Sequence, residues 1–213
     1  LGPLVDDWTP VLWVIAVLTM VVGTVVGVSQ TSIKRMLAYS SIAHAGYLLV
    51  AIIAANDIGK ASLLFYLASY AVTNVAAFGI IALLGSRESA NDQLRDYAGL
   101  AHSHPALAAL FTVFLLSLGG FPPTAGFIAK WYTFSAAVAE GYYGLAIIGM
   151  LSSVVSVYFY LRIVVMMYMT ERDARPVPPP VSGLAMAGLV VSMVAVVYLG
   201  VLPAQVIDWA EQS

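Results

Sequence analysis

The sequence predicts an all-α membrane protein with six transmembrane helices, of which the fourth is discontinuous. Hydrophobic residues make up 61% of the chain and charged residues only 9%, whereas soluble domains average about 45–50% and about 25%. The mean hydropathy is +0.92, and apolar runs of similar length recur between short polar joints. A soluble protein must cover its surface with polar groups, so this composition indicates a chain surrounded by lipid.

Five apolar segments are each long enough for one membrane crossing, which needs about 20 residues. They are 10–29, 38–55, 62–84, 144–169 and 183–202. The remaining segment, 105–138, would form a helix of roughly 50 Å, which exceeds a hydrocarbon core of about 30 Å. Its middle reads Gly119-Gly120-Phe121-Pro122-Pro123, a sequence that interrupts helices. It is therefore either two short crossings or one broken crossing.

The positions of the basic residues favour a single broken crossing, because cytoplasmic loops carry an excess of Lys and Arg. With six spans, only Lys60 falls on the opposite side, and Lys130 lies within a span. All other basic residues fall on or near one side: Lys34, Arg35, Arg87, Arg95, Arg162, Arg172 and Arg175. Two crossings in 105–138 would remove this bias. We therefore expect both chain ends, which are acidic, to lie on the non-cytoplasmic side.

Lys130 is the first candidate for chemistry. It follows the Gly-Gly-Phe-Pro-Pro interruption and is surrounded by Phe127, Ile128, Ala129 and Trp131. A lysine at mid-membrane costs at least about 2.5 kcal/mol on insertion scales, so it usually faces a partner or water. Breaks in membrane helices occur at transport sites of many carriers. We predict that Lys130 relays protons; the alternative is a lysine whose amino group extends to the membrane interface.

His44 and Lys34 are the other candidates. His44 lies within an apolar span, near the hydroxyls of Tyr39, Ser40, Ser41 and Tyr47. Histidine titrates near neutrality and can pass protons, although a histidine that only packs between helices is an equal alternative. Lys34 lies at a span edge, where it is either a topological signal at the cytoplasmic surface or a proton entry point.

The composition and motifs argue against several other functions. The net charge is −2, and no basic patch indicates nucleic-acid binding. The sequence contains no cysteine, which excludes disulfides, thiolate metal sites and cysteine-held iron–sulfur clusters. It also has no glycine-rich phosphate loop. We therefore expect no cofactor or metal in this chain.

Two stretches carry a specific resemblance to a known family: SQTSIKRMLAYSSIAHAGYLLV at 29–50 and LSLGGFPPTAGFIAKWYTFSAAV at 116–138. Both resemble the antiporter-like subunits of respiratory complex I, the NADH:quinone oxidoreductase, and most closely its bacterial subunit N, the counterpart of mitochondrial subunit 2. The resemblance implies that 1–170 is a five-helix antiporter-like repeat, the second of two inverted repeats. It implies that 171–213 is a Pro-rich loop and the last transmembrane helix. Because the chain begins at Leu1 and matches only the carboxy-terminal half of that family, we expect an amino-terminal half to precede it.

The resemblance also implies roles for the candidate residues. Lys130 corresponds to the lysine of the second broken helix, and His44 to a position on the central polar axis. Quinone reduction elsewhere would drive Lys130 to take a proton from this axis and release it outward. NADH, FMN, iron–sulfur clusters and quinone would bind other subunits, and the partners would be other membrane-arm subunits and the lipid bilayer. The expected location is a bacterial inner membrane.

Two alternatives remain open from the sequence. The same motifs occur in multisubunit sodium/proton antiporters and membrane-bound hydrogenases, for which sodium-dependent exchange without NADH oxidation would be diagnostic. The chain could also be a structural scaffold of the membrane arm, in which Lys130 is merely paired. Removing its charge would then harm assembly and not pumping.

Overall fold

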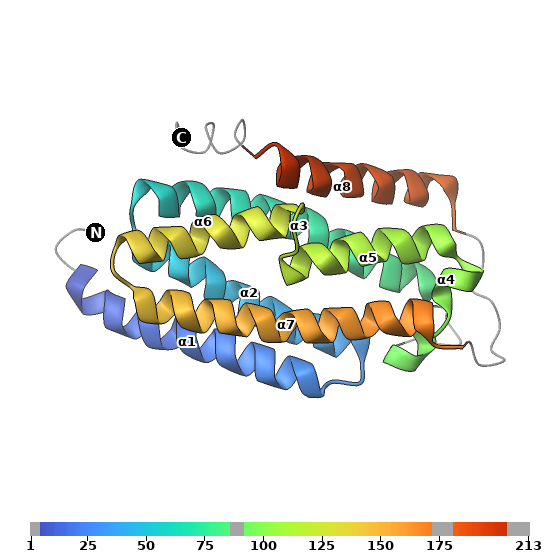
Figure 1. Ribbon diagram of the computed structural model, residues 1–213, viewed down its shortest axis with the longest axis horizontal. Helices are drawn as coiled ribbons and strands as arrows, with labels where there is room; N and C mark the ends of the chain where they lie inside the picture. The colour runs from blue at the N-terminus through green and yellow to red at the C-terminus, as the bar shows by residue number, and fades with distance from the viewer. Residues whose placement is uncertain (1–4, 86–91, 172–180, 204–213) are drawn as a thin grey trace.

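The computed structural model describes residues 5–85, 92–171 and 181–203, and these form helices joined by short connections (Figure 1). The elements are α1 (Val5–Ser29), α2 (Ile33–Ala54), α3 (Asp57–Leu84), the 3₁₀ helix η2 (Leu94–Tyr97), α4 (Leu100–Ser103), α5 (Pro105–Gly119), α6 (Ala125–Ala139), α7 (Tyr143–Met169) and α8 (Gly183–Val201). Some predictions concern residues outside these ranges. They are the side of the membrane on which Arg87, Arg172 and Arg175 lie, the Pro-rich loop, and the two chain ends.

Five helices, α1, α2, α3, α7 and α8, are long and apolar enough to cross a membrane. They coincide with the five simple spans that the sequence predicts, but α1, α2 and α3 each begin five residues earlier than predicted. Ser32 caps α2 by accepting a hydrogen bond from the backbone N–H of Arg35, and Asn56 caps α3 by accepting from Gly59 at 2.7 Å. Polar capping residues satisfy the free N–H groups of a first helical turn, so the helices extend into segments that look like polar joints.

The segment 105–138 is interrupted where the sequence predicts. Helix α5 ends at Gly119, and Gly120 adopts the left-handed conformation (φ +85°) that favours glycine. The N–H of Gly120 donates to the carbonyls of Leu116 and Ser117. Helix α6 begins at Ala125 and continues in the same direction as α5, while α7 returns beside both of them (Figure 1). The chain therefore has two short helices in succession in the place of one long helix.

The apolar side chains divide between the interior and the outer surface. Phe111, Phe114 and Phe159 are fully buried within the largest core cluster. Large apolar side chains are also exposed, and they recur along the outer faces of α1, α7 and α8: Val11, Leu18, Val25, Leu151, Val154, Tyr158, Leu184, Val191 and Val194. Apolar outer faces on long helices match a lipid surrounding, in which the helical backbone satisfies its own hydrogen bonds.

Candidate functional site

Lys130 lies in the second turn of α6 and is buried, with 5% of its surface exposed. Its amino group, Nζ, donates three hydrogen bonds. Two reach the backbone carbonyls of Leu118 and Gly119, both at 3.0 Å, and the third reaches the Ser153 hydroxyl at 2.8 Å. An ammonium group has three N–H donors, so this environment satisfies all of them.

The two carbonyls are available because α5 ends beside Lys130. The last carbonyls of a helix have no partner within the helix, and the turn at Gly120 and Phe121 bonds only to Leu116 and Ser117. The carboxyl end of a helix also carries a partial negative charge. The interrupted helix therefore supplies both hydrogen-bond acceptors and a favourable field for a buried cation.

Two glycines allow the Lys130 side chain and the two helices to approach. A methyl group on Gly120 would lie 3.0 Å from Cδ of Lys130, so the lysine occupies the space beside this glycine. A side chain on Gly126 would collide with the backbone carbonyl of Ser117. The N–H of Gly126 donates to the Ser117 hydroxyl at 3.2 Å, which joins the start of α6 to the end of α5.

His44 lies on α2 and is also buried, with 5% of its surface exposed. Its Nδ1 is 2.7 Å from the Tyr66 hydroxyl on α3, and its Nε2 is 3.5 Å from the Tyr160 hydroxyl on α7. The Tyr160 hydroxyl also hydrogen-bonds Ser40. The Tyr70 ring lies against the imidazole, with 4.7 Å between centroids. Tyrosine hydroxyls from α3 and α7 thus bond to a histidine on α2.

Tyr47 joins the surroundings of Lys130 and His44. Nζ of Lys130 is 5.2 Å from the centre of the Tyr47 ring, within the range of a cation–π interaction. The same ring meets the His44 ring edge-on, with 5.6 Å between centroids. Tyr47 therefore contacts both side chains. The structure therefore brings together these two sequence-predicted residues.

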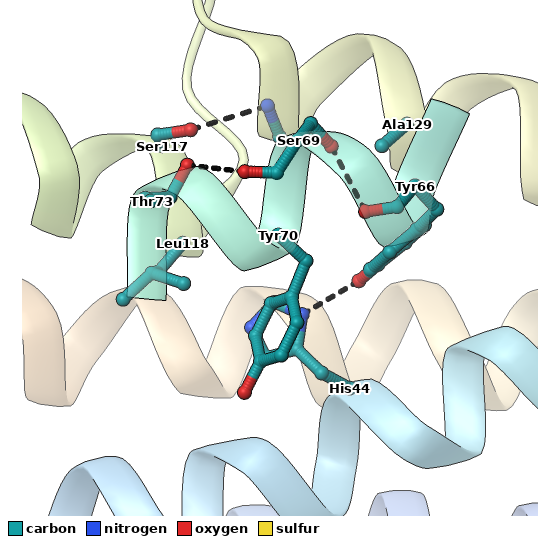
Figure 2. Close-up of a pocket in the computed structure, with 9 residues that line it drawn as sticks. His44, Tyr66, Ser69, Tyr70, Thr73, Ser117, Leu118 and Ala129 are labelled. Carbon is teal, nitrogen blue, oxygen red and sulfur yellow. Dashed lines mark hydrogen bonds between the residues drawn. The ribbon is translucent and has the colours of Figure 1, made fainter. Parts of the chain in front are cut away.

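A small cavity of about 10 Å³ connects the two parts of the site (Figure 2). His44, Tyr66 and Tyr70 line it on one side, and residues of the α5–α6 interruption line it on the other: Ser117, Leu118, Gly126 and Ala129. Ser69 and Thr73 on α3 complete the lining. One water molecule needs about 10–15 Å³ of such volume, so the cavity reaches only the lower end of that range.

Lys34 lies in the first turn of α2, roughly 15 Å along the helix from His44. Its Nζ is 2.5 Å from a carboxylate oxygen of Asp92, and both side chains are partly exposed. The backbone holds Asp92 in place, because its carbonyl accepts from the N–H of Ile33 at 2.7 Å. Lys34 therefore does not join Lys130 and His44 but pairs with the segment that follows α3.

Three residues of the site, Ser153, Tyr66 and Tyr160, are not distinguished by the sequence. Serine and tyrosine are scattered through all the apolar segments, and only the three-dimensional contacts identify these three. Ser40, by contrast, is among the hydroxyls that the sequence places near the histidine. Within the described ranges, no group of three or more His, Asp or Glu side chains is arranged to hold a metal ion.

The fold and the site define a multi-pass helical membrane protein with a buried lysine at a helix interruption. Residues 3–156 match the family model described as "NADH:quinone oxidoreductase/Mrp antiporter, TM". Since this match covers most of the chain, the protein belongs to that transmembrane family.

The similarity extends to curated relatives. The chain is 47% identical over 214 residues to "NADH-quinone oxidoreductase subunit N" of Trichlorobacter lovleyi, a match that includes 99% of this chain and 43% of the relative. The chain thus spans less than half the length of the relatives that it matches.

Two solved structures share the fold. A chain of respiratory complex I from Thermus thermophilus with bound aureothin has a TM-score of 0.83 and 34% identity, covering 93% of this chain and 45% of that chain. A chain of the Mrp complex from Dietzia sp. has a TM-score of 0.85 and 22% identity, covering 96% and 46%. At 22% identity, the Mrp likeness concerns the fold alone.

Proposed function

We propose that this chain is the proton-translocating, carboxy-terminal part of subunit N of a NADH:quinone oxidoreductase. The observation that carries the proposal is the environment of Lys130, a buried amino group that donates to two carbonyls at a helix interruption and to one hydroxyl. The match to subunit N and to a chain of complex I supports the choice of complex.

The surroundings of Lys130 suit both of its protonation states. The charged form donates to Leu118, Gly119 and Ser153. The neutral amine has two donors and one lone pair, so the carbonyls keep their bonds. The Ser153 hydroxyl, which can donate as well as accept, then turns to the lone pair. The cavity is bordered by His44 and by Leu118, whose carbonyl accepts a hydrogen bond from Lys130. In this proposal a proton crosses the cavity to reach Lys130.

The arrangement of helices supports a specific topology. In this proposal α5 and α6 together form one broken crossing, which gives six crossings with α1, α2, α3, α7 and α8. Residues 1–170 form the second inverted repeat, and 171–213 the loop and last helix. The chain ends face the non-cytoplasmic side of a bacterial inner membrane. Other membrane-arm subunits are the partners, and NADH, FMN, iron–sulfur clusters and quinone bind elsewhere in the complex.

The Mrp complex provides a second candidate function, sodium/proton exchange, because its fold is equally similar. The subunit N relatives are far more similar in sequence, which favours the respiratory enzyme. A scaffold role would leave the lysine paired but unused, and the same experiment separates it from proton transfer.

The test is proton pumping by inverted membrane vesicles that carry the full-length protein in its complex, normalised to NADH:quinone turnover. Lys130→Ala is compared with Lys60→Ala, which removes an exposed lysine paired with Asp57 at 3.1 Å. We expect Lys130→Ala to lower protons pumped per electron while the complex still assembles, and Lys60→Ala to pump as the wild type does. Equal pumping by both variants would refute the proposal, and loss of assembly in Lys130→Ala would favour the scaffold.

A further inference from the structure

The hydrogen bonds of His44 define a continuous chain of exchangeable protons across the bundle. The groups follow one another in this order: the Ser40 hydroxyl, the Tyr160 hydroxyl, Nε2 and Nδ1 of His44, and the Tyr66 hydroxyl. Ser40, Tyr66 and Tyr160 are each at most 2% exposed. Tyr66 and His44 border the cavity beside the α5–α6 interruption. The chain of groups therefore begins at Ser40 and ends at this cavity.

The partners of His44 do not fix which ring nitrogen carries the proton. A neutral imidazole has one N–H donor and one acceptor nitrogen, and a carboxylate or backbone carbonyl would force its partner nitrogen to be the donor. In the described part of the chain, the ring hydrogen-bonds two tyrosine hydroxyls. A hydroxyl both donates and accepts, so each tautomer of His44 finds suitable partners at both nitrogens.

We propose that Tyr66 and Tyr160 are proton-relay residues, and that His44 passes one proton between them by exchanging its tautomer. This inference rests on the proposed function, because it supplies the route by which a proton reaches the Lys130 side of the site. The two tyrosines are distinct from Tyr70, whose ring packs on His44 but whose hydroxyl donates to Ser41 at 2.7 Å.

The step balances in protons. At the start, Ser40 donates to Tyr160, Tyr160 donates to Nε2, Nδ1–H donates to Tyr66, and Tyr66 donates into the cavity. A proton that enters at Ser40 moves each of these hydrogens one acceptor onward, and one proton leaves the Tyr66 oxygen toward the cavity. His44 is then protonated at Nε2 instead of Nδ1, and every hydroxyl points the other way.

The exchange carries a single proton before it must be reset. In the second tautomer Nδ1 is an acceptor, so no further proton can leave toward Tyr66 until the ring and hydroxyls rearrange. The Tyr70 ring against the imidazole opposes free rotation of the ring. The relay therefore conducts in steps rather than as an open proton channel.

The test uses Tyr66→Phe and Tyr160→Phe in the full-length protein within its complex, with Tyr97→Phe as the control. Tyr97 is a buried tyrosine outside the site, in the 3₁₀ helix. A positioned relay group contributes on the order of 100-fold to a proton-transfer rate. We expect each site variant to lower protons pumped per electron with assembly retained, and Tyr97→Phe to pump as the wild type does. Tyr66 and Tyr160 act in series, so the double variant should lose no more than the worse single variant.

A second background separates a relay role from a structural one. His44→Gln keeps an amide that can bond to hydroxyls but cannot exchange protons. In that background, the inference predicts no further loss from Tyr66→Phe or Tyr160→Phe, and additive losses would overturn it. Normal pumping by both tyrosine variants beside a deficient Lys130→Ala would overturn this inference alone. Normal pumping by Lys130→Ala would overturn the proposed function itself.

Discussion

Nζ of Lys130 lies 3.0 Å from the carbonyl oxygen of Gly119, a residue that is 11 positions earlier and that ends helix α5. A continuous helix would have used that carbonyl for its own backbone hydrogen bond. The interruption and the buried lysine are therefore parts of one arrangement. The break exposes acceptors in an apolar region, and the lysine satisfies them.

Ser153 should be needed for proton exchange at Lys130. Ser153→Ala removes one of the three hydrogen-bond partners of Nζ, and a hydrogen bond to a charged group contributes about 1.5–3 kcal/mol. We expect fewer protons pumped per electron with assembly intact, and recovery in Ser153→Thr, which keeps a hydroxyl. The neighbouring Ser152→Ala serves as the control in the same vesicle assay. Wild-type pumping by Ser153→Ala would show that the third bond is dispensable.

Gly120 should tolerate no side chain. Alanine at a left-handed position costs about 1–2 kcal/mol, and its methyl group would lie 3.0 Å from Cδ of Lys130. Gly120→Ala should therefore lower both the thermal stability of the purified complex and its pumping. Gly188, on α8, has open space around its Cα, so Gly188→Ala should be neutral or slightly stabilising. Equal stability of the two variants would contradict the described turn.

Lys34 should anchor the end of the bundle and not move protons. Its ion pair with Asp92 is partly exposed, with 46% and 36% of the two side chains accessible. Such pairs contribute about 0.2–1 kcal/mol and are weakened by salt. Lys34→Ala should lower thermal stability slightly at low ionic strength and leave pumping unchanged.

A charge exchange provides the control for this pair. The double variant Lys34→Asp with Asp92→Lys should recover the stability that either single variant loses. An assembled Lys34→Ala complex that fails to pump would instead support the alternative role of Lys34 as a proton entry point.

The sequence predicts the long helices and the interruption well, because both depend on local composition. Apolar length identifies α7 and α8 to within one residue and the end of α1, and the Gly-Gly-Phe-Pro-Pro stretch identifies the break. The starts of α2 and α3 are missed because Ser32 and Asn56 act as caps, whereas the same residues in a sequence look like part of a polar joint.

The candidate site is predictable only in its ionisable residues. A lysine or histidine within an apolar segment is rare enough to identify Lys130 and His44. Tyr160 lies 116 positions from His44 and Ser153 lies 23 from Lys130, and nothing in the local sequence distinguishes them from other hydroxyl residues. Their contribution depends on how helices pack, as does the pairing of Lys34 with Asp92.

The most direct test of the central claim, that Lys130 gives up and regains its proton, is the pumping ratio of Lys130→Arg. Arginine keeps the positive charge but cannot be deprotonated in a protein. We predict that an assembled Lys130→Arg complex oxidises NADH and pumps fewer protons per electron than the wild type. A wild-type ratio in this variant would mean that only the charge at this position matters, and it would contradict proton exchange at Lys130.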